Sequence, residues 1–192
     1  MRHGSPLPRP VSGALWAAAL LPGLIAYNLP PSPTLFNQAA ALGLWGIAIA
    51  ALAPAHAASL HTAMARTQAL QLALLPMAIA AILSSALGSL PWALGLSAAG
   101  LIAATMALAL GGASLRPTPT LLVAFFSAWL GAGLLNSAIA LIQVFAPQWA
   151  DGDWIARSAI PGRAVGNMRQ PNHLATLLLW SCLLYTSPSP RD

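Results

Sequence analysis

LGLSAAGLIAATMALALGGA, residues 94–113, contains no charged side chain in twenty consecutive positions. As an α-helix it would rise about 30 Å at 1.5 Å per residue, which matches the hydrocarbon core of a bilayer. Residues 39–53 form a second uncharged apolar run. Both runs are typical of helices that have lipid as their solvent.

The composition disfavours a water-soluble globular domain. Of the 192 residues, 58% are hydrophobic and 6% are charged, whereas soluble domains carry about 25% charged residues. The net charge is +5 and all eight basic residues are arginine, but they are scattered over loops and form no basic face for nucleic acid. The single cysteine, Cys182, excludes an internal disulfide and a cysteine-based metal site.

The apolar runs predict an all-α integral membrane protein, a multi-span helical bundle with five complete spans and the start of a sixth. The predicted parts are a basic cytoplasmic leader (1–10), five transmembrane helices (11–145), a polar loop (146–171) and the start of a sixth helix (172–181). The five spans are expected at 11–29, 35–53, 70–87, 92–113 and 121–145. The first could be a cleaved signal peptide, but its length favours an uncleaved span.

Two features between and within the spans lead to further predictions. Residues 54–68 are polar but rich in alanine, which predicts an interfacial helix; its two histidines are five apart, off the spacing of a helical metal pair. Asn136 lies inside the fifth span and is expected to bond across helices. The pairs Gly43/Gly46 and Gly131/Gly133 are expected to allow close helix contact.

The arginines predict the orientation in the membrane. Arg2, Arg9, Arg66 and Arg116 fall on one side of the predicted path, while the turns at 28–34 and 88–91 carry no charge. The positive-inside rule places the arginine side, and the N-terminus, in the cytoplasm of a bacterial inner membrane. The 146–171 loop is then periplasmic, and its three arginines oppose the trend. A functional site would explain them.

The sequence GRAVGNMRQPNHLATLLLW, residues 162–180, ends this loop and begins the sixth helix. Pro171 restricts Gln170 to an extended backbone. Asn172 is therefore expected to cap the helix, with His173 as its first residue. The helix start offers free N–H groups and the positive end of the helix dipole.

Charge and glycines gather just before this helix. Arg163 and Arg169 can each hold two phosphate oxygens, and Gly162 and Gly166 let the loop fold tightly and approach a ligand. These features predict an anion site at the membrane surface, suited to phosphate or pyrophosphate. In the alternative interpretation, the arginines touch lipid headgroups and Asn172 only caps the helix.

GRAVGNMRQPNHLATLLL resembles the motif of the bacterial O-antigen ligase superfamily, and most closely that of the pilin-type protein O-oligosaccharyltransferases. Their signature, G-R-x-x-G-N-x-x-Q-P-N-x-L-A, is matched at every fixed position. The resemblance covers about twenty residues and implies a metal-independent inner-membrane enzyme with a periplasmic active site. Such an enzyme moves an oligosaccharide from a polyprenyl-pyrophosphate carrier to a protein Ser/Thr hydroxyl, to lipid A–core sugar or to a growing glycan.

By position in this motif, the resemblance implies that Arg163 and Arg169 contact the pyrophosphate. His173 completes the predicted catalytic group and would brace the site, since the general base of the family is expected in a later periplasmic loop; a role for His173 as that base is the alternative. The predicted substrate-binding residues are Gly162, Gly166, Asn167, Gln170 and Asn172. No cofactor is expected, and Asp151 and Asp153 are interpreted as solvated loop acids rather than metal ligands.

The chain ends in CLLYTSPSPRD, residues 182–192, which looks like a translated sequencing adapter rather than a natural C-terminus. The protein is then expected to be longer, and the chain alone inactive; a genuine Ser/Pro-rich end is the alternative. Other functions stay open at this point: O-antigen ligase or polymerase, a transporter or flippase of a lipid-linked glycan, or a membrane scaffold.

Overall fold

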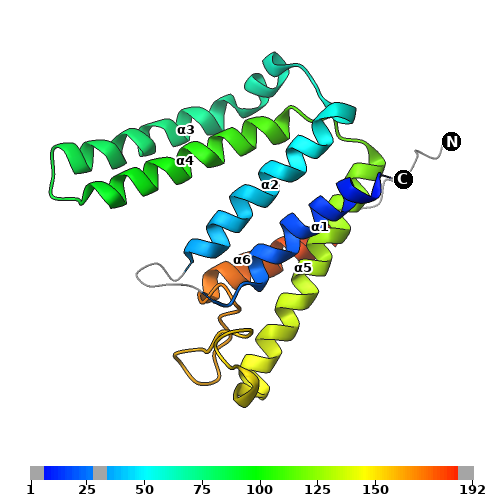
Figure 1. Ribbon diagram of the computed structural model, residues 1–192, viewed down its shortest axis with the longest axis vertical. Helices are drawn as coiled ribbons and strands as arrows, with labels where there is room; N and C mark the ends of the chain where they lie inside the picture. Colours follow the sequence, from blue (N-terminus) through cyan, green and yellow to red (C-terminus); the bar gives the residue numbers. More distant parts are fainter. Residues whose placement is uncertain (1–6, 28–33, 186–192) are drawn as a thin grey trace. The chain divides into compact units, whose positions relative to one another are not determined.

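The computed structural model describes residues 7–27 and 34–185, and within them the chain is built from helices with no β-strand (Figure 1). The predicted all-α class is confirmed. The helices are α1 (Arg9–Leu24), α2 (Leu35–His56), α3 (Leu60–Ala86), α4 (Trp92–Ala113), α5 (Pro119–Phe145), the short 3-10 helix η1 (Pro147–Trp149) and α6 (Pro171–Tyr185). The proposed artificial tail lies partly outside these residues, from 186 onward.

Four helices of the described chain, α2 to α5, are long and apolar enough to cross a membrane. This supports a multi-pass membrane protein. The first predicted span is shorter than expected: α1 has 16 residues, which rise about 24 Å against a core of about 30 Å. The helix ends at Leu24, and the next residue, Ile25, has an extended backbone.

The helical character predicted for residues 54–68 is confirmed except at 57–59. Helix α2 continues to His56, and α3 begins at Leu60, so the segment is divided between two long helices. Ser59 caps α3, since its hydroxyl accepts a hydrogen bond from the backbone N–H of Thr62 at 3.2 Å. The polar residues at the start of α3 therefore extend a predicted span rather than form an element of their own.

Residues 46–117 form one compact unit, which contains the antiparallel hairpin of α3 and α4 (Figure 1). Gly95 allows α4 to lie directly against Ser85 of α3. Polar side chains of α3 reach across to backbone carbonyls near the end of α4: Gln71 Nε2 donates to Met106 O at 2.9 Å, and Arg66 Nη1 to Ala113 O at 3.3 Å. These bonds satisfy polar groups that lipid would leave unpaired.

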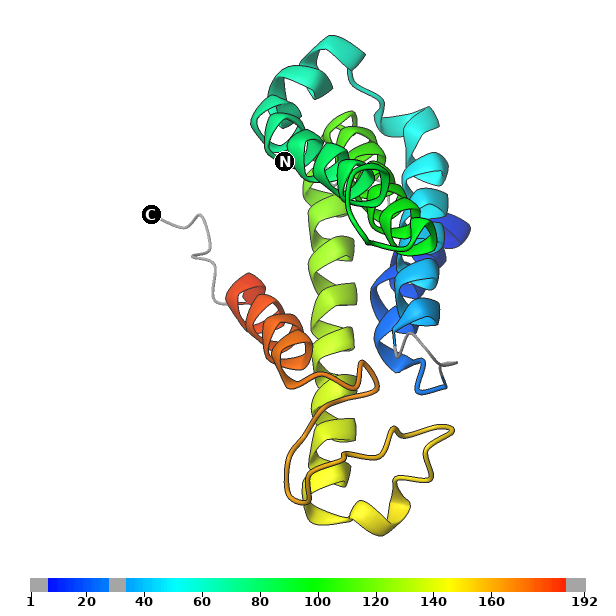
Figure 2. The ribbon, with the colours of Figure 1, turned by 90° about the vertical axis from the view of Figure 1, so that its left-hand side faces the viewer.

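The second unit comprises residues 1–45 and 118–192, and α5 is its centre (Figure 2). Both α1 and α6 pack on α5. Gly131 faces the ring of Trp16 in α1, and Gly133 faces Ser181 in α6, so the predicted role of this glycine pair is confirmed. Gly43, in contrast, has nothing within 4 Å of the place where a Cβ would stand.

The predicted interhelical bond of Asn136 is wrong. Its side chain is fully buried and donates to Ala132 O of its own helix at 2.9 Å. Its Oδ1 has no hydrogen-bond partner among the described residues. Its side chain packs against Gly23 of α1, 3.0 Å from the place where a Cβ would stand, so this amide contributes shape to the α1–α5 contact.

Candidate functional site

The loop that joins α5 to α6 is organised first by one carboxylate. Asp151 Oδ1 accepts the backbone N–H groups of Asp153, Trp154 and Ile155 at 3.0, 2.9 and 3.1 Å. These bonds lower the pKa of Asp151 below its ordinary value of 3.8, and the N–H of Ile155 contributes most to that lowering. The predicted solvated acid is exposed, as expected, but it also shapes the turn.

A buried glutamine then joins two distant parts of the loop to α5. Gln143 lies near the end of α5 and its side chain is 3% exposed. Its Oε1 accepts the N–H groups of Val165 and Gly166, both at 2.9 Å. Its Nε2 donates to Ala156 O at 2.7 Å and to Gly166 O at 3.3 Å. One side chain thus fixes the positions of residues 156 and 165–166.

Asn167 makes a second link of the same kind. It is 1% exposed. Its Oδ1 accepts the N–H of Ala156 at 3.0 Å, and its Nδ2 donates to Leu24 O at 2.7 Å and Trp154 O at 2.9 Å. The predicted substrate-binding amide is therefore bonded to the loop and to the end of α1.

Two tight turns place the arginines. Ile160 and Arg163 close the first, with the Arg163 N–H donating to Ile160 O at 3.2 Å; Pro161 and Gly162 lie between them, and Gly162 has φ +74°. Pro followed by a residue of positive φ is typical of a type II turn. Gly166, with φ +62°, opens the second turn, which Arg169 closes. The prediction that both glycines serve tight folding is confirmed.

The two arginines are held differently. Arg169 has φ +54°, a left-handed conformation that is rare outside glycine. Its guanidinium donates through Nε and Nη2 to Ala26 O at 3.3 and 3.0 Å. Arg163 is exposed, and within the described part of the chain its guanidinium has no hydrogen bond or ion pair.

The start of α6 differs from the prediction. The helix begins at Pro171, and Leu174 N donates to Gln170 O at 3.1 Å, so Gln170 occupies the capping position in place of Asn172. Proline fits the first helical position because its missing N–H has no helical partner there. Asn172 and His173 follow in the first turn, both exposed, and their N–H groups are free helix-start donors.

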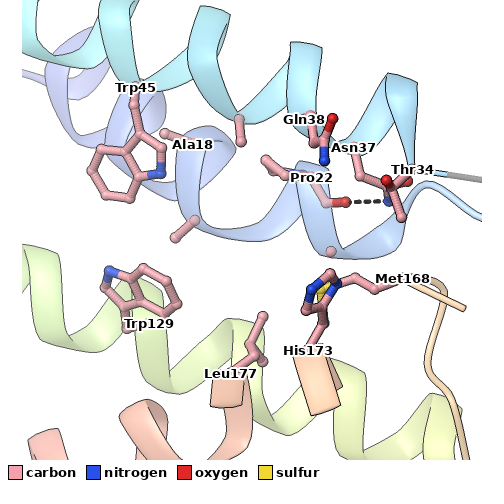
Figure 3. A pocket seen from close by; sticks show the side chains of 13 residues that line it. Ala18, Pro22, Thr34, Asn37, Gln38, Trp45, Trp129, Met168, His173 and Leu177 are labelled. Carbon is pink, nitrogen blue, oxygen red and sulfur yellow. Dashed lines mark hydrogen bonds between the residues drawn. The ribbon is translucent and has the colours of Figure 1, made fainter. Parts of the chain in front are cut away.

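A cavity of about 220 Å³ lies between α1, the first part of α2, α5 and α6 (Figure 3). Its walls are mostly apolar, and the ring of Trp129 stacks on that of Trp45 with 6.3 Å between centroids. The side chains of His173 and Met168 close one end (Figure 3). The remaining lining residues are Ala18, Ala19, Pro22, Gly23, Thr34, Asn37, Gln38, Ala41 and Leu177.

A second cavity, of about 190 Å³, lies inside the loop itself. Arg157 lines it and is fixed there by a bond from its Nε to Ala150 O at 2.9 Å. Gln143 and Gly162 also border this cavity. Sequence reasoning did not identify Gln143, although an amide near the end of an otherwise apolar span is a signal of the kind that singled out Asn136.

The structure thus gathers Gly166, Asn167 and Arg169 into one turn directly before the helix that carries Asn172 and His173. Residues 164–184 match the sequence model of a family described as protein glycosylation ligase. No curated protein and no solved structure matches the chain. The family match supports a ligase of this kind and covers the second turn and most of α6. Gly162 and Arg163 precede the matched segment.

Proposed function

We propose that the protein is an inner-membrane oligosaccharyltransferase. It moves an oligosaccharide from a polyprenyl-pyrophosphate carrier to an acceptor hydroxyl, a Ser or Thr of a protein such as a pilin, on the periplasmic side. The family match over residues 164–184 carries this proposal, together with the arginine-bearing turn before α6 that the match includes. The resemblance to O-antigen ligases keeps a lipid A–core or glycan acceptor as the alternative.

In this reaction the bond between the anomeric carbon of the sugar and a phosphate oxygen breaks, and the acceptor oxygen forms a bond to that carbon. The hydroxyl proton leaves to a base, and the carrier pyrophosphate departs with the electron pair. Negative charge grows on the pyrophosphate as the bond breaks. Groups fixed in place before the reaction stabilise that charge more in the transition state than in the ground state.

The site offers three sources of positive potential for this leaving group. Arg169 uses Nε and Nη2 to hold Ala26 O, which leaves Nη1 for a phosphate oxygen. Arg163 is exposed and can close on the same anion. The N–H groups of Asn172 and His173 lie at the positive end of the α6 dipole. Gln170 and Asn167 then support the backbone that carries these donors.

The arrangement favours an enzyme over a transporter or flippase. Transporters bind substrate near the middle of the membrane at interrupted helices. Here the charged residues gather in a loop and at the beginning of a helix. His173, which lines the apolar cavity together with Met168, takes the bracing role.

The test is glycan transfer in cells that make a lipid-linked oligosaccharide and express the complete reading frame that encodes this chain. Arg163→Ala and Arg169→Ala are expected to reduce transfer at least tenfold. Arg116→Ala is the matched control, because it removes the same charge from an exposed position in the other unit. Undiminished transfer in both site variants would remove the proposed role, and export of the glycan without transfer would favour the transporter.

The proposed side of the membrane has a test of its own. In a cysteine-free background of the complete reading frame, Ala159→Cys is expected to react with a membrane-impermeant thiol reagent in intact cells with a permeabilised outer membrane. Ala57→Cys, exposed in the segment predicted to be cytoplasmic, is expected to react only after lysis. The reverse pattern would place the arginines in the cytoplasm and would contradict the proposal.

A further inference from the structure

We infer that Gln143 is a positioning residue for the transfer reaction: it holds the loop in the shape that presents Arg163 and Arg169 to the pyrophosphate. This inference rests on the proposed function and deepens it. Gln143 lies outside the motif and outside the family match, which begins at residue 164. Its four side-chain hydrogen bonds all go to backbone groups of the loop, and none goes to an arginine side chain.

The bonding pattern explains why the residue is a glutamine. Two adjacent N–H groups, of Val165 and Gly166, point at one oxygen, and two carbonyls, of Ala156 and Gly166, face one nitrogen. Among side chains of this length, only a primary amide accepts two hydrogen bonds at its oxygen and donates two from its nitrogen. The residues it bonds are themselves buried, so water would not replace the amide easily.

The held backbone is directly connected to both arginines. Val165 stands two residues after Arg163, on the far side of the Ile160–Arg163 turn. Gly166 O accepts both Gln143 Nε2 and the N–H of Arg169. A shift of residues 165–166 therefore moves the end of one turn and the beginning of the other, and it moves both guanidinium groups together.

Further hydrogen bonds join the segment around residue 156 to residues 165–167. The C=O of Ala156 is bonded to Gln143, and its N–H is bonded to Asn167 Oδ1. The two segments around residues 156 and 165–167 are thus joined by two amides, one anchored in α5 and one in the turn itself. Without the bonds of Gln143, Asn167 would still join these two segments to each other and to the end of α1. It would not join them to α5, the helix on which α6 packs.

The experiment compares Gln143→Met, which keeps the approximate volume and removes all four bonds, with Gln148→Met as the matched control at an exposed position in η1. Both are made in the complete reading frame and assayed in membranes with a polyprenyl-pyrophosphate oligosaccharide as donor. Gln143→Met is expected to lower kcat/KM for the donor at least tenfold and to leave the KM for the acceptor within twofold of wild type. Gln148→Met is expected to match wild type for both.

A second measurement separates positioning from folding. Amide hydrogen exchange at Val165 and Gly166 is expected to become at least tenfold faster in Gln143→Met, while exchange in the middle of α5 is unchanged. If Gln143→Met does not accumulate, Gln143→Asn is used, whose shorter amide reaches fewer of the four groups and is expected to show a smaller defect of the same donor-specific kind.

The outcomes are distinguishable. Wild-type transfer together with unaltered donor kinetics in Gln143→Met would overturn the inference and leave the proposed function intact. An equal fall in donor and acceptor kinetics with general loss of exchange protection would also overturn it, since the role would then be structural only. No transfer by wild type and Gln148→Met would overturn the proposed function, and the pyrophosphate role of Gln143 with it.

Discussion

Among the polar residues of the loop, Asn167 is the one whose replacement is expected to destabilise the loop most. Replacing it by alanine removes three hydrogen bonds, to the N–H of Ala156 and to the carbonyls of Leu24 and Trp154. All three lie between 2.7 and 3.0 Å. The bond to Leu24 O joins parts of the chain that are 143 residues apart in sequence, and without it the contact between the loop and the region after α1 depends on the bonds from Arg169 to Ala26 O.

The expected loss of loop stability is the sum of the three lost bonds and the cost of the buried backbone group that loses its partner. A net contribution of about 1 kcal/mol for each bond gives about 3 kcal/mol. Ala156 is fully buried, so its N–H would be left without water and would add about 1 kcal/mol or more. The carbonyl of Trp154 belongs to an exposed residue and can be rehydrated. The expected loss in the free energy of loop opening is therefore about 3 to 4 kcal/mol.

Native-state hydrogen exchange of the Ala156 amide measures this directly. Since 1.36 kcal/mol corresponds to a factor of ten, a loss of about 3 to 4 kcal/mol predicts exchange roughly a hundredfold to a thousandfold faster. Asn172→Ala is the control, because that amide is exposed in the first turn of α6 and its side chain has no hydrogen bond within the described residues; a change below about 0.5 kcal/mol is expected. Exchange in Asn167→Ala within threefold of wild type would refute the reasoning.

Two further predictions concern the loop backbone and its pH dependence. Gly166→Ala and Gly162→Ala each force alanine into a left-handed conformation at a cost of about 1 to 2 kcal/mol; Gly166→Ala is expected to cost more in thermal unfolding, because its Cβ would lie 3.2 Å from Leu174 Cδ1 while that of Gly162 meets nothing within 4 Å. Equal losses would contradict the Leu174 contact. The lowered pKa of Asp151 means that its contribution to loop stability is present above pH 3.8 and is lost as the pH falls through the folded-state value. The fluorescence of exposed Trp154 is expected to report this loss in the wild type and not in Asp151→Asn; the same transition in both proteins would exclude Asp151 as its cause.

The helices could be predicted from apolar length because lipid leaves few alternatives for uncharged runs of about 20 residues. The predicted fourth span, 92–113, coincides with α4, and the fifth differs from α5 by two residues at one end. The first span was predicted too long, since hydropathy continues past Leu24 whereas the backbone becomes extended at Ile25. Hydropathy indicates whether a segment prefers lipid or water, and it does not indicate at which residue the helix ends.

The motif could be located from sequence, but its internal bonding could not. Asn167 was expected to meet substrate, and in the structure its polar atoms bond backbone groups. The position of Gln143 near the end of an apolar span is visible in the sequence, but its bonding partners, up to 23 residues away in the chain, are defined only once the loop is folded onto α5. The capping residue is Gln170 and not the predicted Asn172, because the fixed φ of Pro171 suits the first position of the helix.

The buried and the exposed positions of this site carry different types of polar residue, and this difference has a physical reason. The buried positions carry neutral amides, Gln143 and Asn167, which hold the backbone without the large desolvation cost of a buried ion. The arginines are exposed to solvent. Asp151 bonds its own turn, and no ion pair joins an arginine to an acid within the described residues. Three arginines against two aspartates in residues 146–171 therefore leave a positive potential that an anion can neutralise. In the proposed reaction, the pyrophosphate of the carrier lipid supplies the negative charge that balances these arginines.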